Sequence, residues 1–177
     1  YTAGHEQEVA RIACMIAQRM QLPAEQIESI RIAASLHDIG KIAVPSEILT
    51  KPRRLNKLEM EMVKTHSQNA YEILKNIDFP YPIANIILQH HERLDGSGYP
   101  GGLAGDHILL EARIIGVADT IEAMAAHRPY RPALGIKAAL DEISNNSGKL
   151  YDPEIVRICL DIYADRGDNA FEREDVH

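Results

Sequence analysis

The sequence predicts an all-α protein that folds as a single-domain helical bundle. Apolar residues recur at helical spacing along nearly the whole chain, and no stretch alternates long enough to indicate a strand. The length of 177 residues suits one domain with a proper core, and no apolar run is long enough to span a membrane. We therefore expect one domain over residues 1–165 and a polar C-terminal tail over 166–177, which should fray.

The first half of the chain predicts three helices. They cover residues 4–20, 23–40 and 57–75. The first carries an apolar stripe on one face. Pro23 suits the first position of the second helix, and Gly40 is expected to end it. Asn56 and Glu59 match a capping box, which predicts the start of the third helix.

The second half predicts four more helices and one long loop. The helices cover residues 81–92, 108–127, 135–147 and 153–165. The last of them has Asp152 as its N-cap and Pro153 at its first position. The loop at 92–107 contains five glycines and has no periodicity. Loops of this length inside a compact domain usually have a function.

Composition excludes some classes of partner. The net charge of −7 argues against a surface for a nucleic-acid polymer, which would be basic. An anionic small molecule remains compatible, because a bound metal can reverse the local field. Cys14 and Cys159 lie in apolar helical patterns, as expected for core residues in a reducing cytoplasm. The chain begins inside an amphipathic pattern. We therefore expect it to be the cytoplasmic part of a longer bacterial protein, with a sensory or receiver domain on its N-terminal side that could tether it.

Polar side chains occupy the predicted apolar faces of several helices. They are His37, Asp38, His66, His90, His91 and Asp119. Any single one could be a hydrogen-bonded core residue, but so many buried titratable groups in one chain need a shared partner. Divalent cations with nitrogen and oxygen ligands would supply it. Because zinc-finger spacing is absent and no cysteine is near, the pattern predicts a catalytic metal site.

Three motifs in this sequence resemble the HD-GYP domain, a branch of the HD phosphohydrolases. They are HDIGK at 37–41, HHERLDGSGYPGG at 90–102 and RPYR at 128–131. The likeness runs from about Gly4 to Tyr163, and the extended GYP motif is far more specific than the HD pair. The resemblance implies a helical bundle of the HD-domain type. It also implies hydrolysis of the bacterial second messenger cyclic di-GMP to linear pGpG and on to GMP.

The resemblance implies two divalent metal ions, with iron or manganese as the expected metals. Seven positions match the family's ligands: His5, His37, Asp38, His66, His90, His91 and Asp119. His5, His37 and Asp119 would hold one ion and the other three histidines the second, with Asp38 as the bridge. Some members bind a third ion through an acidic residue at the place occupied here by Tyr1, which argues against a third ion.

The expected mechanism uses His37, Asp38 and Lys41 as catalytic residues. A hydroxide that bridges the two ions would attack phosphorus in line with the leaving ribose oxygen, while the metals neutralise the growing charge. Lys41 is placed to contact a non-bridging phosphate oxygen. The alternative for Lys41 is a solvated lysine that complements the dipole at a helix end.

Substrate contacts are expected from two further segments. Gly98, Tyr99 and Pro100, the GYP triplet, would form a wall of the cleft against the dinucleotide. Arg128 and Arg131 would contact the second phosphate or a guanine, for which the planar guanidinium is suited. The family also suggests diguanylate cyclase (GGDEF) domains as protein partners of the GYP loop.

Two other functions are compatible with the same residues. The domain could hydrolyse another cyclic dinucleotide such as cyclic GMP-AMP, since the metal pair would be unchanged. It could also be a non-catalytic module that binds cyclic dinucleotides or proteins, as degenerate members of the family do. The complete set of seven ligands disfavours the second alternative.

Overall fold

The computed structural model describes residues 4–126 and 134–171, and helices are the regular elements of these ranges, as predicted. The α-helices are His5–Arg19 (α1), Ala24–Leu36 (α2), Ser46–Leu49 (α3), Lys57–Lys64 (α4), His66–Leu74 (α5), Ile83–Gln89 (α6), Leu110–Ala125 (α7), Ile136–Asn145 (α8) and Pro153–Arg166 (α9). Short 3₁₀ helices cover Ile39–Ala43 (η1), Gly105–His107 (η2) and Gly167–Asn169 (η3).

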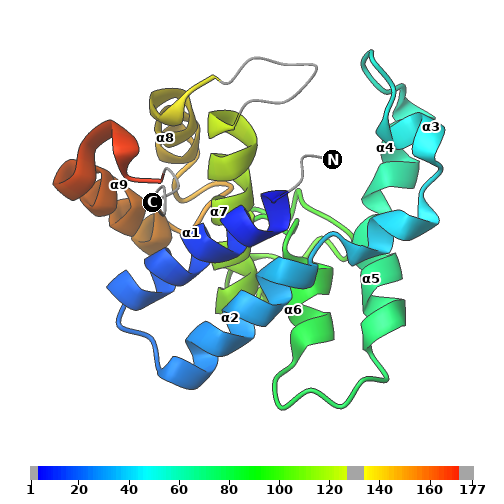
Figure 1. Cartoon of the computed structure of the whole chain (residues 1–177), viewed down its shortest axis with the longest axis horizontal. Coiled ribbons are helices and arrows are strands. Elements are labelled where there is room, and N and C mark those ends of the chain that lie inside the picture. The colour runs from blue at the N-terminus through cyan, green and yellow to red at the C-terminus, as the bar shows by residue number, and fades with distance from the viewer. Residues whose placement is uncertain (1–3, 127–133, 172–177) are drawn as a thin grey trace.

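Helix α1 packs against both α2 and α7 (Figure 1). Helices α5 and α6 pack together on one side, and α8 and α9 pack against α7 on the other. Helices α3 and α4 stand at one end, beyond α5 (Figure 1). Isoleucines from six of the described helices, including Ile12, Ile30, Ile86, Ile114 and Ile155, are fully buried in the core. Burial of each such side chain stabilises the fold by about 1.5–3 kcal/mol.

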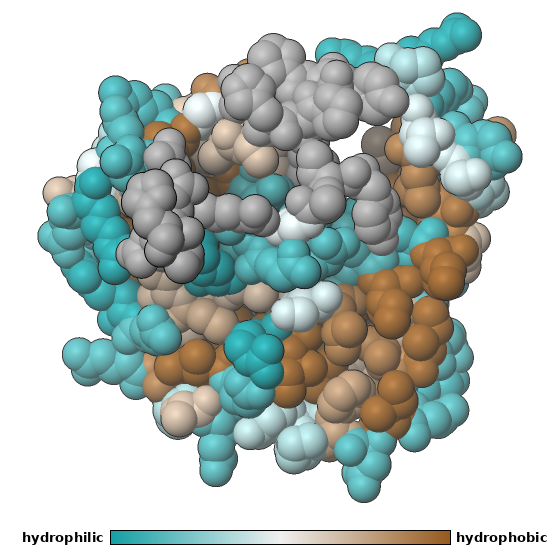
Figure 2. Space-filling view, viewed as in Figure 1, coloured by the Kyte–Doolittle hydropathy of each residue, from teal (hydrophilic) through white to brown (hydrophobic). Residues whose placement is uncertain are grey.

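The surface of the molecule is mixed in polarity. On the face shown in Figure 2, apolar surface gathers over the region where α2, α5 and α6 lie in Figure 1. Apolar atoms supply much of the surface of any folded protein, so this area by itself assigns no function. Among the described residues, none of the helices combines the length and apolar character needed to cross a lipid bilayer.

Most predicted helices are confirmed, and two local signals act as expected. The Asn56 side chain accepts from the Glu59 amide and the Glu59 side chain accepts from the Asn56 amide, which completes the capping box. Asp152 caps α9 by accepting from the Glu154 amide, with Pro153 at the first position. Local chemistry alone therefore sets the start of these two helices.

Several predicted helices are shorter than expected, among them the helix predicted over 81–92, which covers Ile83–Gln89. The helix predicted over 57–75 is interrupted at Thr65, whose amide and hydroxyl both donate to the Met62 carbonyl and so end α4. The helix predicted over 23–40 ends at Leu36, and the chain turns before it enters η1. Helix α3 was not predicted from the sequence. Both interruptions lie beside histidines, which they direct toward the interior.

The described start of the predicted tail is packed against the domain. Ala170 and Phe171 are buried and belong to the core. The Phe171 carbonyl accepts a hydrogen bond of 2.6 Å from Arg11. Burial of the phenylalanine ring favours this ordered position, so the expected fraying is wrong as far as residue 171. Residues 172–177 lie outside the described residues, and the boundary at 165 stays a prediction.

Gly40 joins η1 to α5 through a direct backbone contact. A Cβ atom at this position would lie 1.9 Å from the carbonyl oxygen of His66 and 2.5 Å from the amide nitrogen of Ala70. Neither atom can move without displacing α5. Glycine is therefore required here because of close approach, and not because of its backbone angles.

Replacement of Gly40 by alanine is expected to destabilise the fold. The added methyl group overlaps the backbone of α5, and overpacking of this kind costs about 1–3 kcal/mol. Urea unfolding of Gly40→Ala would measure the loss. Ile42→Ala is the matched control, because Ile42 lies in the same 3₁₀ helix and is 83% exposed. Equal stability of the two variants would contradict the packing argument.

Candidate metal centre

Seven polar side chains from five segments of the chain meet inside the bundle. His5 begins α1, His37 and Asp38 follow α2, and His66 begins α5. His90 and His91 follow α6, and Asp119 lies within α7. These are the seven side chains that the sequence picked out as ligands. The chain gathers them although they are up to 114 positions apart.

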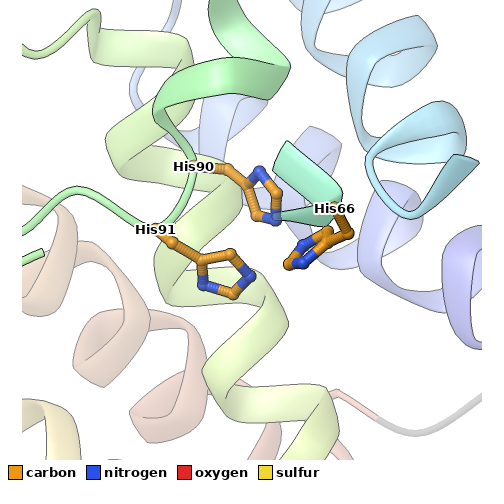
Figure 3. Close-up of side chains that lie close together, drawn as sticks. All are labelled: His66, His90 and His91. Atoms are coloured by element: carbon orange, nitrogen blue, oxygen red, sulfur yellow. The ribbon is translucent and has the colours of Figure 1, made fainter. Parts of the chain in front are cut away.

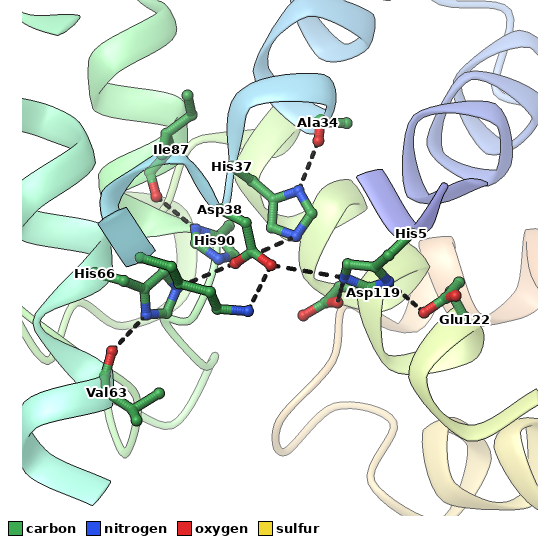
Figure 4. Close-up of polar contacts among 11 residues, drawn as sticks. His5, Ala34, His37, Asp38, Val63, His66, Ile87, His90, Asp119 and Glu122 are labelled. Carbon is green, nitrogen blue, oxygen red and sulfur yellow. Dashed lines mark hydrogen bonds and ion pairs between the residues drawn. The ribbon is translucent and has the colours of Figure 1, made fainter. Parts of the chain in front are cut away.

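The donor atoms fall into three close groups. Within each group, one nitrogen or oxygen of every residue lies within 4.8 Å of the others. The groups are His66, His90 and His91 (Figure 3); His5, His37 and Asp119; and His37, Asp38 and His90. The first two groups coincide with the two predicted ligand sets. Asp38 lies between them, 3.7 Å from His37 and from His66 and 4.0 Å from His5 (Figure 4).

Three of the histidines are anchored in the same way, at the ends of helices. In each, Nδ1 lies within hydrogen-bond distance of the carbonyl oxygen three residues earlier (Figure 4). The pairs are His37 with Ala34 (2.6 Å), His66 with Val63 (2.7 Å) and His90 with Ile87 (2.6 Å). These carbonyls belong to the last turns of α2, α4 and α6. Because Nδ1 donates its proton there, Nε2 is left as an acceptor that faces the cluster.

Two of these acceptors lack a hydrogen-bond donor within the part of the chain that the structure describes. Nε2 of His66 and Nε2 of His90 are buried and make no hydrogen bond. A buried polar atom without a partner costs about 1–3 kcal/mol. Several neutral imidazole nitrogens and carboxylates aimed at one point suit a divalent cation of mixed nitrogen and oxygen preference. The donor set therefore fits a metal site.

The electrostatics of the cluster favour the neutral form of His66, His90 and His91. Burial lowers the pKa of His90 to about 3, and the neighbouring His37 and His66 add to this effect. Burial and the charge of His90 lower the pKa of His91 well below its ordinary value. Burial also lowers the pKa of His66. Neutral imidazole is the form that binds metal.

The two aspartates are kept ionised. Burial acts to raise the pKa of Asp38, but the charges of His37 and Lys41 outweigh it and hold that pKa below its usual value. Burial also opposes ionisation of Asp119, yet the hydrogen bond from His5 and the surrounding histidines hold its pKa well below the usual range. Both carboxylates are thus in the form that a cation requires.

Glu122 is a residue of the site that sequence reasoning missed. It is buried, and its carboxylate contacts Nδ1 of His5, while Nε2 of His5 lies 3.3 Å from Asp119 (Figure 4). Burial lowers the pKa of His5, but hydrogen bonds with Asp119 and Glu122 outweigh it and raise that pKa to about 9. Glu122 thus orients His5 as backbone carbonyls orient the other histidines. It lies one helical turn after Asp119, so the same argument from apolar faces could have found it.

The loop that carries the Gly98–Tyr99–Pro100 triplet, called the GYP loop, is held beside the cluster by hydrogen bonds to a buried carboxylate. Glu92 accepts hydrogen bonds from the amides of Gly101 (2.6 Å) and Leu103 (2.9 Å). The ring of Tyr99 stacks on His91, with centroids 4.8 Å apart and planes 22° apart. A Cβ at Gly98 would lie 2.3 Å from the His91 carbonyl, so the loop backbone passes directly over the site histidines.

The remaining predicted residues lie around this loop or outside the described chain. Pro100 is exposed next to Tyr99. The ammonium of Lys41 lies 2.5 Å from Asp38, at the edge of the cluster. Arg128, Arg131 and Tyr1 lie outside the described residues, so their predicted roles have no structural test.

Fold and donor set together define a helical protein with an interior histidine–aspartate site of the kind that binds divalent cations. The family model described as the HD domain matches residues 2–155, and the chain belongs to that family. Membership of the HD family, which the HDIGK motif predicted, is thereby confirmed.

Curated relatives and solved structures agree with this assignment. The chain is 42% identical over 161 residues to the cyclic di-GMP phosphodiesterase response regulator RpfG of Xanthomonas campestris, covering 90% of this chain and 43% of that protein. It is 41% identical to the 3'3'-cGAMP-specific phosphodiesterase 3 of Vibrio cholerae, covering 87% of this chain and 34% of that protein. The chain thus spans less than half the length of these relatives.

A solved structure supports the fold independently of sequence identity. It is Bd1817, an HDG"Y"P protein from Bdellovibrio bacteriovorus, which superposes with a TM-score of 0.74 at 18% identity. The match covers 90% of this chain and 51% of that chain. At this identity the likeness speaks for the arrangement of helices alone.

Replacement of Glu122 by alanine is expected to weaken metal binding. Loss of a partner that orients a ligating histidine typically reduces affinity about 10- to 100-fold. Competition between the protein and a chelator for Mn²⁺ would measure the change. Glu122→Gln keeps an acceptor for His5 and should lose less affinity. Glu111→Ala on the same helix is the control, and equal affinity of both alanine variants would contradict the role of Glu122.

Proposed function

We propose that this chain is the catalytic domain of a cyclic-dinucleotide phosphodiesterase that hydrolyses cyclic di-GMP to linear pGpG and on to GMP. The observation that carries the proposal is the convergence of seven nitrogen and oxygen donors beneath a GYP loop. A relative 42% identical to this chain carries the name cyclic di-GMP phosphodiesterase. Phosphodiester hydrolysis is also the chemistry that such a donor set serves best.

The seven donors would hold two divalent ions, with iron or manganese as the native metals. His5, His37 and Asp119 would hold one, and the second would be held by His66, His90 and His91, with Asp38 shared. Bound ions of this kind lower the pKa of an attacking water and neutralise charge on the phosphoryl oxygens.

The protein's own residues position the substrate and the donors. Anchoring of the imidazoles to helix-end carbonyls fixes their orientation before any ligand binds, which limits the entropy lost on binding. The Lys41 ammonium, next to Asp38, would donate to a non-bridging phosphate oxygen. The flat ring of Tyr99 would provide a wall for a base or a ribose. Arg128 and Arg131 would add contacts to the second phosphate or to a guanine.

A second candidate substrate is cyclic GMP-AMP. The specific observation in its favour is the 41% identity to a relative named as a 3'3'-cGAMP-specific phosphodiesterase. The donor cluster touches the phosphate that both substrates share, so it does not choose between them. A non-catalytic binding module is disfavoured, because all seven donors are present and lie together.

The wider setting of the domain is also proposed. Because the chain spans 43% of its relative RpfG, we infer an N-terminal sensory or receiver domain in a longer bacterial protein of the cytoplasm. GGDEF domains are proposed as partners of the GYP loop, which lies at the rim of the cluster. The net charge of −7 supports the view that no nucleic-acid polymer is a partner.

The double variant His37→Ala with Asp38→Ala should lose activity and metal but keep its fold. Both residues belong to the donor groups, and removal of buried polar atoms leaves the apolar core in place. Anaerobically purified protein would be assayed for metal content, circular dichroism and products of cyclic di-GMP and cyclic GMP-AMP side by side. The control is Ser35→Ala, whose hydroxyl donates to the Arg31 carbonyl within α2.

The expected result is turnover below detection in the double variant, with helical content within about 10% of the starting protein, since the apolar side chains that pack the helices are unchanged. Hydrolysis at the original rate in this variant would refute the proposed site. The ratio of the two substrate rates in the unsubstituted protein would decide between the two candidate substrates.

A further inference from the structure

A second lysine stands at the rim of the cluster, in a place that the mechanism above does not use. Lys64 is the last residue of α4, two positions before His66. Its ammonium nitrogen lies 5.4 Å from the centroid of the Tyr99 ring, close enough for a cation–π contact. Tyr99 in turn stacks on His91. The lysine is thus connected to the donor cluster through two packed rings.

The contacts of Lys64 leave its charge available to an anion. Its ion pair is with Glu61, three residues earlier on the same helix, at 2.9 Å. The two side chains are 36% and 58% exposed, and exposed pairs of this kind contribute little to stability. A phosphate could therefore take the place of Glu61 at small cost.

A cyclic dinucleotide has a need that such a cation would meet. It carries two phosphodiester groups, and only one of them can lie at the donor cluster at a time. The other must rest elsewhere on a protein whose net charge is −7. Lys41 is engaged with Asp38 at the cluster, and Arg93 donates to the carbonyls of His90 and Glu92. Lys64 instead presents its charge over the loop that borders the cluster.

We propose that Lys64 is a substrate-binding residue whose ammonium, alongside the contacts proposed for Arg128 and Arg131, holds the phosphodiester that is not being cleaved. The inference rests on the proposed function, since it assumes a dinucleotide with two phosphates. Lys64 would contribute equally to binding of the substrate and of the transition state. Its loss should then raise KM and leave kcat nearly unchanged.

The structure offers a closely matched control in Lys75. Lys75 pairs with Glu72, three residues earlier, and its ammonium lies 5.9 Å from the centroid of Tyr71. It thus repeats the ion pair and the ring contact of Lys64, but at the end of α5 that is far from His66. Any effect of losing such a lysine on helix stability alone should appear in both positions.

The test compares Lys64→Gln, Lys64→Arg and Lys75→Gln in the metal-loaded protein. For Lys64→Gln we expect KM for cyclic di-GMP to rise about tenfold, the value for one lost charge-assisted contact, with kcat within about twofold. Lys64→Arg should restore most of the affinity, and Lys75→Gln should match the starting protein. Hydrolysis of bis(p-nitrophenyl) phosphate, which has a single phosphodiester, should be unchanged in all three variants.

An equilibrium measurement separates this inference from the proposed function. Calorimetry with a slowly hydrolysed bis-phosphorothioate analogue of cyclic di-GMP gives a Kd that does not depend on turnover. A protein that binds the analogue but hydrolyses nothing would overturn the proposed hydrolysis, and the Kd of Lys64→Gln would still decide the role of Lys64. Unchanged KM and Kd in Lys64→Gln, or equal losses on both substrates, would overturn the inference. Absence of binding by the unsubstituted protein would overturn both.

Discussion

The structure depends on a single constraint, which is that imidazole acceptors must face one another inside an apolar bundle. The chain meets it by ending α2, α4 and α6 beside a histidine whose Nδ1 lies on a carbonyl of the last turn. Each contact joins the ring to a carbonyl near the end of a helix and fixes the direction of the ring. Helix termination and ligand orientation are therefore the same structural event in this fold.

The buried histidine acceptors that suit a metal site lower the stability of the fold. Buried acceptors such as Nε2 of His66 and of His90 lower the stability of the bundle, and the isoleucine core must offset them. A cation that binds the folded state alone adds its binding free energy to folding. The bundle and its metal are thus energetically coupled, and a protein with such a site is most stable in its loaded form.

The sequence predicts the helices of this fold well, because their signals are local. Capping residues such as Asn56 and Asp152 and the apolar periodicity need no knowledge of tertiary contacts. The interruption at Thr65 was not predicted, because no glycine or proline marks it; the Thr65 amide and hydroxyl end α4 by donating to the Met62 carbonyl. The close approach at Gly40 was likewise read as a helix end, since only the folded structure brings α5 against it.

The same distinction applies to the site. Histidines and aspartates on apolar faces revealed most of the cluster, since a polar residue there is costly unless it has a partner. Glu122 carried the same signal and was missed, whereas Lys64 carried none, because a lysine at the end of an exposed helix is ordinary. Lys64 and Tyr99 are 35 positions apart in the sequence, and only the folded structure shows that they lie close together.

The position of the cluster also limits what can determine substrate choice. Two relatives with nearly equal identity to this chain, 42% and 41%, carry names with different cyclic dinucleotides. Under the proposed function, the donor cluster would act on a phosphodiester that is chemically identical in both, so it would not distinguish guanine from adenine. Discrimination would require groups that reach the base, and the loop held by Glu92 is a segment that borders the cluster. The histidines and aspartates would then define the reaction, and the less regular segments around them would define the molecule on which it is carried out.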